Sequence, residues 1–159
     1  LGSYSVYNIS LVKNIMETNN TPFREGTKNA HIFSTTAPYN NPYQGTDPCW
    51  LFVCSAGLLR SPTGARLAGL HNINARSCGS AIKYALIPIS ANLINWADKI
   101  VFVCKENYEE ALSLFDQETL EHLHYQIVTK SVVLNIPDQY EYMHPELIEH
   151  FNKELFNNL

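Results

Sequence analysis

The chain has little of several features that mark whole classes of protein. Only 16% of its 159 residues are charged, the net charge is −4 and the pI is about 5.8, which argues against a nucleic-acid partner. No apolar run approaches the ~20 residues of a membrane span, and no basic segment leading into an apolar one predicts a signal peptide. The four cysteines form no Cys-x-x-Cys pair, so we expect free thiols in a reducing, cytoplasmic compartment.

The composition is otherwise that of a globular protein. Hydrophobic residues make up 45% of the chain, and its length suffices for one domain with a substantial core. We expect this domain to span residues 48–159 and residues 1–47 to form an N-terminal extension. The first three residues, Leu-Gly-Ser, include no methionine, and we interpret residues 1–3 as a cloning remnant.

The extension is dominated by turn-forming residues. Residues 7–18 have apolar side chains at helical spacing, whereas residues 19–48 are rich in Asn, Pro and Gly, with one short strand expected at 31–34. A long segment of this kind is usually functional. Its Tyr39–Tyr43 stretch is either a lid or partner-docking loop or an ordered cover over the edge of a sheet.

From Trp50 onward, strand and helix patterns alternate, which predicts an α/β domain with a parallel sheet covered on both faces. The predicted strands are residues 50–53, 73–77, 99–104 and 125–134. The predicted helices are residues 61–71, 86–97, 106–115 and 145–157, with a further helical turn at 117–124.

The segment from Trp50 to Arg66 carries the strongest chemical signal. An apolar run ends at Cys54, Arg60 follows across a short loop, and a helix-compatible segment follows Pro62. In a parallel sheet, ligands bind beyond the carboxyl ends of strands, where loops enter helices. A cysteine and an arginine at such a junction fit the attack of a thiolate on a phosphate monoester. The alternative is a buried structural cysteine beside an unrelated surface arginine.

Each residue type in this loop has a use in that chemistry. Backbone N–H groups of residues 55–60 can surround a dianion, and the N-terminus of the next helix adds positive potential. These surroundings favour the thiolate of Cys54, which is the nucleophilic form. Arg60 offers a planar fork to two phosphoryl oxygens, and Ser61 can hydrogen-bond the thiolate. The predicted phosphate-binding residues are Ser55, Ala56, Gly57, Leu58, Leu59, Arg60 and Ser61.

A phosphate ester of a phenol also needs an acid that protonates its leaving oxygen. Asp138 follows the last predicted strand, beside the restricted backbone of Pro137, and Tyr140 and Tyr142 are close enough in sequence to flank an aromatic substrate. The alternative is that Asp138 forms a turn before the final helix. We predict that Cys54, Arg60 and Asp138 are catalytic and that Tyr140 contacts the substrate.

These motifs resemble those of the low-molecular-weight protein tyrosine phosphatases. Val53–Pro62 resembles the phosphate-binding signature, and Ala97–Val103 resembles an Ala-Asp-x-Ile strand of that family. Ile136–Leu147 is similar to the acid loop of a compact branch of predicted tyrosine phosphatases, Ile-Pro-Asp-x-Tyr-Glu-x-Met-x-Pro-Glu-Leu. The resemblance covers about residues 50–157.

The resemblance implies a single three-layer domain with a four-stranded parallel sheet and a two-step reaction without metal or cofactor. Cys54 would attack phosphorus while Asp138 protonates the phenol, and Asp138 would then activate water to hydrolyse the phosphocysteine. The substrate would be a phosphotyrosine protein or a small aryl phosphate.

The loop departs from the family at two places. Ala56-Gly57 stands where the family has Gly-Asn, and glycine reaches a left-handed backbone without the bracing asparagine. Leu59 stands where many relatives have a second, redox-active cysteine. Cys104 either takes over that role or is a buried thiol.

The sequence also allows other interpretations. An arsenate reductase of the same fold would need a close downstream cysteine pair, which the chain does not have. A phosphate- or partner-binding module without turnover fits the Ala56-Gly57 departure. His122 and His124 have no partner at zinc-like spacing, so they are expected at a solvated helix end. Asp98 either braces the active-site scaffold or is a polar residue at a helix end.

Overall fold

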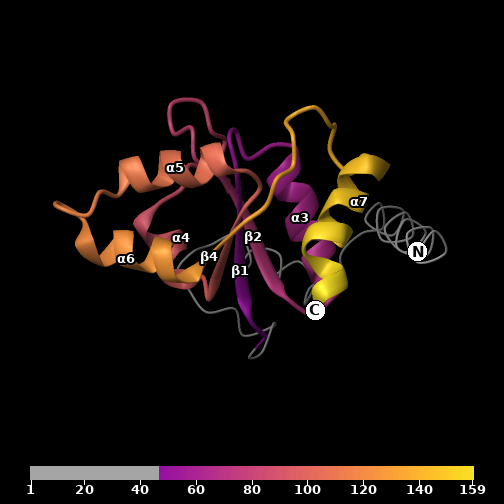
Figure 1. The fold of residues 1–159 in the computed structure, drawn as a ribbon, viewed down its shortest axis with the longest axis horizontal. Helices are drawn as coiled ribbons and strands as arrows, with labels where there is room; N and C mark the ends of the chain where they lie inside the picture. Colours follow the sequence, from indigo (N-terminus) through magenta and orange to yellow (C-terminus); the bar gives the residue numbers. More distant parts are fainter. Residues whose placement is uncertain (1–46) are drawn as a thin grey trace, which may run out of the picture.

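The central sheet of the computed structural model, which describes residues 47–159, has four parallel strands (Figure 1). The expected elements at 7–18 and 31–34 and the Tyr39–Tyr43 segment lie outside the described residues. The strands are β1 (Cys49–Cys54), β2 (Asn74–Gly79), β3 (Lys99–Phe102) and β4 (Ser131–Val133), in the order β2-β1-β3-β4. The predicted α/β class and four-stranded parallel sheet are therefore confirmed.

Helices cover both faces of the sheet, as Figure 1 shows. They are α3 (Arg60–Gly69), α4 (Ala91–Trp96), α5 (Lys105–Leu114), α6 (Glu121–Lys130) and α7 (Pro145–Glu154), followed by a short 3-10 turn at Phe156–Asn158. Helices α3 and α7 lie on one face, and α4, α5 and α6 lie on the other.

The side chains of β1 alternate between these two layers, as strand geometry requires. Phe52 and Cys54 point to the layer that contains α3 and α7, whereas Leu51 and Val53 point to the opposite layer. All four are nearly or fully buried, so β1 is the centre of the hydrophobic core. This alternation places the Cys54 thiol on the face from which α3 begins.

Two predicted elements were wrong in extent or type. Residues 121–130 are helical rather than part of a strand at 125–134, because Ile127 is fully buried in the layer of α4 and α5 and the Lys130 amine donates to the carbonyl of Ile94 at 2.9 Å. The helix expected at 86–97 begins only at Ala91, because Pro88 continues the sheet through a bridge to Gly79 and Ser90 caps the helix.

No helix within residues 47–159 has the length and apolarity that crossing a membrane demands.

Candidate active site

The Cys54–Arg60 segment lies at the point where the order of the strands in the sheet reverses. The chain goes from β1 to β2 on one side and then returns to β3 on the other side of β1. In open parallel sheets such a reversal leaves a crevice at the carboxyl ends of the strands, which is where ligands bind. The segments after β1, β3 and β4 therefore meet at one edge, and residues 54–60, which the sequence predicts to bind phosphate, are called the phosphate loop.

The backbone of the phosphate loop is turned by bonds to the segment that follows β2. The carbonyls of Cys54, Ser55 and Ala56 accept from the N–H groups of Ser80 (2.8 Å), Ala81 (3.0 Å) and Leu86 (3.1 Å) respectively. In a planar trans peptide the next N–H points opposite to the carbonyl. The N–H groups of Ser55, Ala56 and Gly57 consequently point away from that segment, and that of Gly57 reaches the Cys54 thiol at 3.3 Å.

Gly57 occupies the left-handed region, with a φ of +73°. A Cβ on Gly57 would lie 2.9 Å from the carbonyl carbon of Cys78, and one on Gly79 would lie 2.4 Å from the carbonyl oxygen of Ser55. Both approaches are too close for a side chain. The loop is thus held against the end of β2 by backbone contact.

The Cys54 thiol is buried and has polar partners. Its sulfur lies 3.1 Å from the Ser61 hydroxyl, which also donates to the carbonyl of Cys78 at 3.2 Å. Helix α3 begins at Arg60, the last residue of the loop, with Leu59 as a cap that offers no side-chain bond and with no acidic residue in its first turn. The positive end of the helix is therefore open toward an anion at the loop.

Arg60 is 3% exposed and its guanidinium spans the edge of the sheet. One terminal nitrogen, Nη1, donates to the carbonyl of Ile136 at 3.0 Å and to the Cys104 sulfur at 3.5 Å, while Nη2 donates to Ser55 Oγ at 3.4 Å. Because both terminal nitrogens are held, the planar fork has a fixed orientation at the loop.

The segment with Asp138 follows β4, which is separated from β1 by β3, and it reaches the loop from that side. Asp138 Oδ1 lies 3.4 Å from Arg60 Nε, and the carboxylate side chain is 66% exposed. On the other side of Asp138, the N–H of Met143 donates to the Thr63 hydroxyl at 2.9 Å. The carboxylate is therefore anchored beside the loop yet open to an incoming molecule.

Tyr140, expected beside the substrate, is instead buried against α7. Its ring lies 5.5 Å from the ring of His150, and its hydroxyl is 3.1 Å from His150 Nε2. Tyr142, with 43% exposure, is the accessible tyrosine of this segment.

Three polar residues of this edge gave no signal in the sequence. Thr63 anchors the segment that carries Asp138, and Ser80 and Asn107 bond to each other at 3.1 Å beside the loop. They come from α3, from the segment after β2 and from α5, so no short motif joins them. A serine or asparagine alone is too common to indicate a role.

Cys104 and Asp98 have different positions relative to the site. Cys104, a free and partly exposed thiol, contacts Arg60 at the edge described above. Asp98 lies at the opposite edge of the sheet, where its carboxylate accepts from the N–H of Cys49 at 2.8 Å. It braces the start of β1 against the start of β3.

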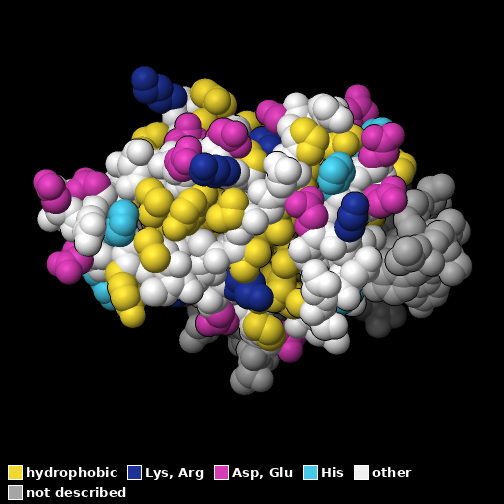
Figure 2. Space-filling view, viewed as in Figure 1, with side chains coloured by type: hydrophobic (Ala, Val, Ile, Leu, Met, Phe, Trp, Pro, Cys, Tyr) yellow, Lys and Arg dark blue, Asp and Glu magenta, His cyan; other side chains and the backbone are white. Residues whose placement is uncertain are grey.

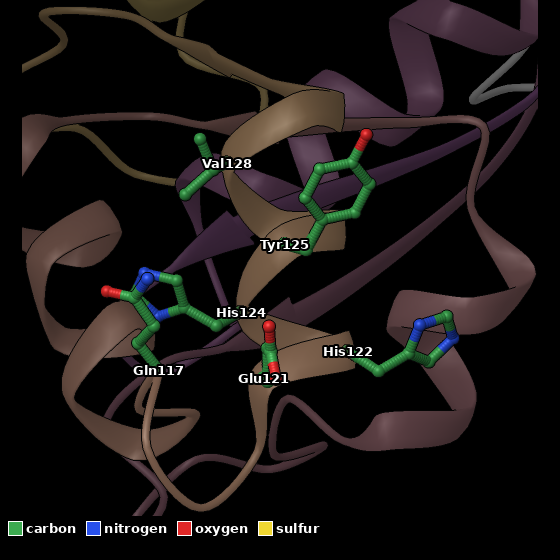
Figure 3. Close-up of a pocket in the computed structure, with 6 residues that line it drawn as sticks. All are labelled: Gln117, Glu121, His122, His124, Tyr125 and Val128. Carbon is green, nitrogen blue, oxygen red and sulfur yellow. The ribbon is translucent and has the colours of Figure 1, made fainter.

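The two histidines at 122 and 124 border a groove on α6, away from the phosphate loop (Figure 3). Figure 3 shows their rings pointing in different directions, and His124 Nδ1 bonds the carbonyl of Phe115 at 2.9 Å. Within residues 47–159, no cluster of three or more Cys, His, Asp or Glu side chains could hold a metal ion. Figure 2 shows hydrophobic side chains gathered between α5 and α6 and charges of both signs on the same face.

No protein-family model matches the sequence, and no curated protein matches it either. Several solved structures are similar to the structure of this chain. The tyrosine phosphatase AmsI of Erwinia amylovora has a TM-score of 0.51 and 18% identity, over 78% of this chain and 99% of that one. Wzb of Vibrio vulnificus, in complex with benzylphosphonate, and a YwlE mutant of Bacillus subtilis each have a TM-score of 0.47 over 67% of this chain and 90% of theirs, with 20% and 14% identity.

Likeness at this level of identity establishes the fold. The described domain has the fold of the low-molecular-weight tyrosine phosphatases, as the motifs in the sequence predicted.

Proposed function

We propose that this protein is a phosphatase that hydrolyses phosphotyrosine or a similar aryl phosphate monoester through a phosphocysteine intermediate. One observation carries the proposal: a thiol, a held guanidinium and an exposed carboxylate converge at one edge of the sheet. Cys54 comes from the end of β1, Arg60 from the start of α3 and Asp138 from the segment after β4. The tyrosine phosphatase fold of AmsI supports it.

In the first step, the Cys54 sulfur attacks phosphorus while Asp138 gives its proton to the phenolic oxygen that leaves. The inward N–H groups of the loop and the Arg60 fork bind the equatorial phosphoryl oxygens, where charge accumulates. The Ser61 hydroxyl lies 3.1 Å from the sulfur, so it can turn its one proton from the carbonyl of Cys78 to the thiolate before attack and after release. In the second step, Asp138 takes a proton from water, which attacks phosphorus and frees inorganic phosphate and the thiolate.

This chemistry supports an aryl phosphate as the substrate class. An aryl ester has the leaving group that one carboxylic acid can assist, and Tyr142 is placed on the same segment as Asp138. We propose no metal, cofactor, nucleic-acid or membrane partner for the reaction. The free thiols support a reducing, cytoplasmic compartment, where the nucleophile stays reduced.

The test is the covalent intermediate itself. The protein is mixed with an aryl phosphate in excess, quenched in acid and digested, and the peptides are examined by mass spectrometry for a phosphoryl adduct on Cys54. Hydrolysis with the adduct on Cys54 supports the proposal. Phosphate binding measured by calorimetry without any hydrolysis would instead favour the module that binds phosphate or a partner and does not turn over.

A further inference from the structure

Asn107 is a buried polar residue for which the mechanism above has no use. It lies in the first turn of α5 and is 2% exposed. Strand β3, which precedes this helix, is paired with β1, so the start of α5 lies beside the phosphate loop. A buried amide is costly unless its hydrogen bonds are made, and those bonds show what it holds.

The amide of Asn107 has three partners. Its nitrogen donates one hydrogen to Ser55 Oγ at 3.0 Å and the other to Ser80 Oγ at 3.1 Å. Its oxygen accepts from the Cys104 thiol at 2.8 Å. Both donors are therefore used, and each partner belongs to a segment that borders the loop.

Two of these partners are also partners of Arg60. The guanidinium donates to Ser55 Oγ through Nη2 and to the Cys104 sulfur through Nη1. Ser55 thus accepts from Asn107 and from Arg60, which occupies both lone pairs of its oxygen and leaves its own proton for a phosphoryl oxygen. Asn107 therefore forms hydrogen bonds with Ser55 and Cys104, the two side chains that accept from the terminal nitrogens of Arg60.

The third partner connects Asn107 to the backbone of the loop. Ser80 donates its N–H to the carbonyl of Cys54 at 2.8 Å, and its hydroxyl donates to the Glu110 carboxylate at 2.5 Å. A single amide consequently joins the side chain of Ser55 to the residue that turns the first peptide of the loop inward.

We propose that Asn107 is a positioning residue for phosphate binding. It fixes the Ser55 hydroxyl and, through Ser55 and Cys104, the plane of the Arg60 guanidinium. Gly57 has no side chain that could make these hydrogen bonds, and they come from Asn107 in α5 instead. The inference rests on the proposed phosphatase function, in that the ligand it serves is the phosphoryl group.

A double-mutant cycle tests this proposal. The variants Asn107→Ala, Ser55→Ala and the double variant are compared for kcat/KM on an aryl phosphate and for the affinity of inorganic phosphate by calorimetry. We expect each single variant to lose roughly tenfold in both, since bonds that orient a charged group are lost. The double variant should lose little more than the single variant with the larger loss, because the two side chains act through one contact.

Asn74→Ala is the matched control. Asn74 is also a buried asparagine whose amide donates to a thiol, that of Cys49 at 3.8 Å, but it lies at the opposite edge of the sheet. It should leave kcat/KM and phosphate affinity at the wild-type values. Equal losses in Asn74→Ala and Asn107→Ala, or losses that multiply in the double variant, would overturn the positioning role.

If Asn107→Ala does not fold, Asn107→Asp keeps the shape of the side chain and replaces the donor by a carboxylate oxygen. Wild-type phosphate affinity in that variant would also overturn the proposal. If the wild-type protein binds phosphate without hydrolysing the ester, the proposed function fails while the cycle on phosphate affinity still decides the role of Asn107. If it binds no phosphate, both fail.

Discussion

The two edges of the sheet carry similar side chains in different surroundings. At the amino edge, where the parallel strands begin, Cys49 lies beside Asp98. Burial together with that carboxylate raises the pKa of the Cys49 thiol. At the carboxyl edge, the Cys54 sulfur receives the N–H of Gly57, contacts the Ser61 hydroxyl and precedes an open helix N-terminus. The direction of the surrounding dipoles, rather than the residue type, distinguishes a candidate nucleophile from a structural thiol.

Exchange of the two thiols gives the largest expected contrast. Cys54→Ser should lower kcat for an aryl phosphate by at least about 10³-fold, because the nucleophile is lost. Cys49→Ser should leave kcat within about twofold, since no part of the amino edge touches the phosphate loop. Steady-state hydrolysis of both variants measures the contrast. Comparable losses would mean that Cys54 has no special role.

The two aspartates give the next contrast. Asp138→Asn should lower kcat by roughly 10²–10⁴-fold, with a larger loss for esters of more basic phenols, because those leaving groups depend most on protonation. Asp98→Asn should keep kcat and lower the free energy of unfolding by about 1 kcal/mol, since a bond to the Cys49 N–H is weakened. A series of aryl phosphates and urea denaturation measure these effects. A uniform loss across the series would remove Asp138 as the acid.

The third contrast concerns two glycines. Gly57→Ala should weaken phosphate binding by about tenfold, because its Cβ would press on the end of β2 and force the loop out of shape. Gly57→Asn should do no better, because its side chain would meet the same backbone atoms of Cys78 and Gly79. Gly69→Ala is the control, since a Cβ there meets nothing within 4 Å. Calorimetry with inorganic phosphate measures all three. Tighter binding in Gly57→Asn would contradict the proposed packing.

The smallest contrast is in alkylation of the wild-type protein. Burial raises the pKa of Cys78, with a further contribution from nearby Cys54, and the pKa of Cys49 is raised as well. A raised pKa keeps a thiol protonated to higher pH, so at neutral pH both should react with iodoacetate more slowly than Cys54. Peptide mapping over time gives the order of labelling, and added phosphate should protect Cys54 alone. Faster labelling of Cys49 would reverse the comparison.

The parts of the site that are local in sequence were predictable. The apolar run of β1, the loop and the start of α3 are continuous, so Cys54, Arg60 and Ser61 were found together. Asp138 was found because a restricted segment follows a strand. In each case the chemistry is carried by neighbours along the chain, and fold rules place the two pieces at one edge.

Elements decided by tertiary contacts were not predictable. Ile127, Val128 and Thr129 are β-branched and favoured a strand, but burial of Ile127 against the sheet stabilises them in α6. The network of Asn107 joins residues up to 52 positions apart, so no short spacing pattern in the sequence indicates it. Tyr140 was expected at the substrate because its burial depends on α7, which packs from outside its own segment.

The anchoring of the acid segment has a consequence for the time course of turnover. Many enzymes carry an essential residue on a lid whose opening limits kcat. Here Arg60 holds the chain just before Asp138, and Thr63 holds it just after, and both belong to the first turn of α3. The segment that carries Asp138 is thus tied to the same helical turn whose Ser61 contacts the Cys54 sulfur. If Asp138 is the acid, as proposed, we expect turnover to include no closing step, and its rate then depends on bond-making and bond-breaking at phosphorus.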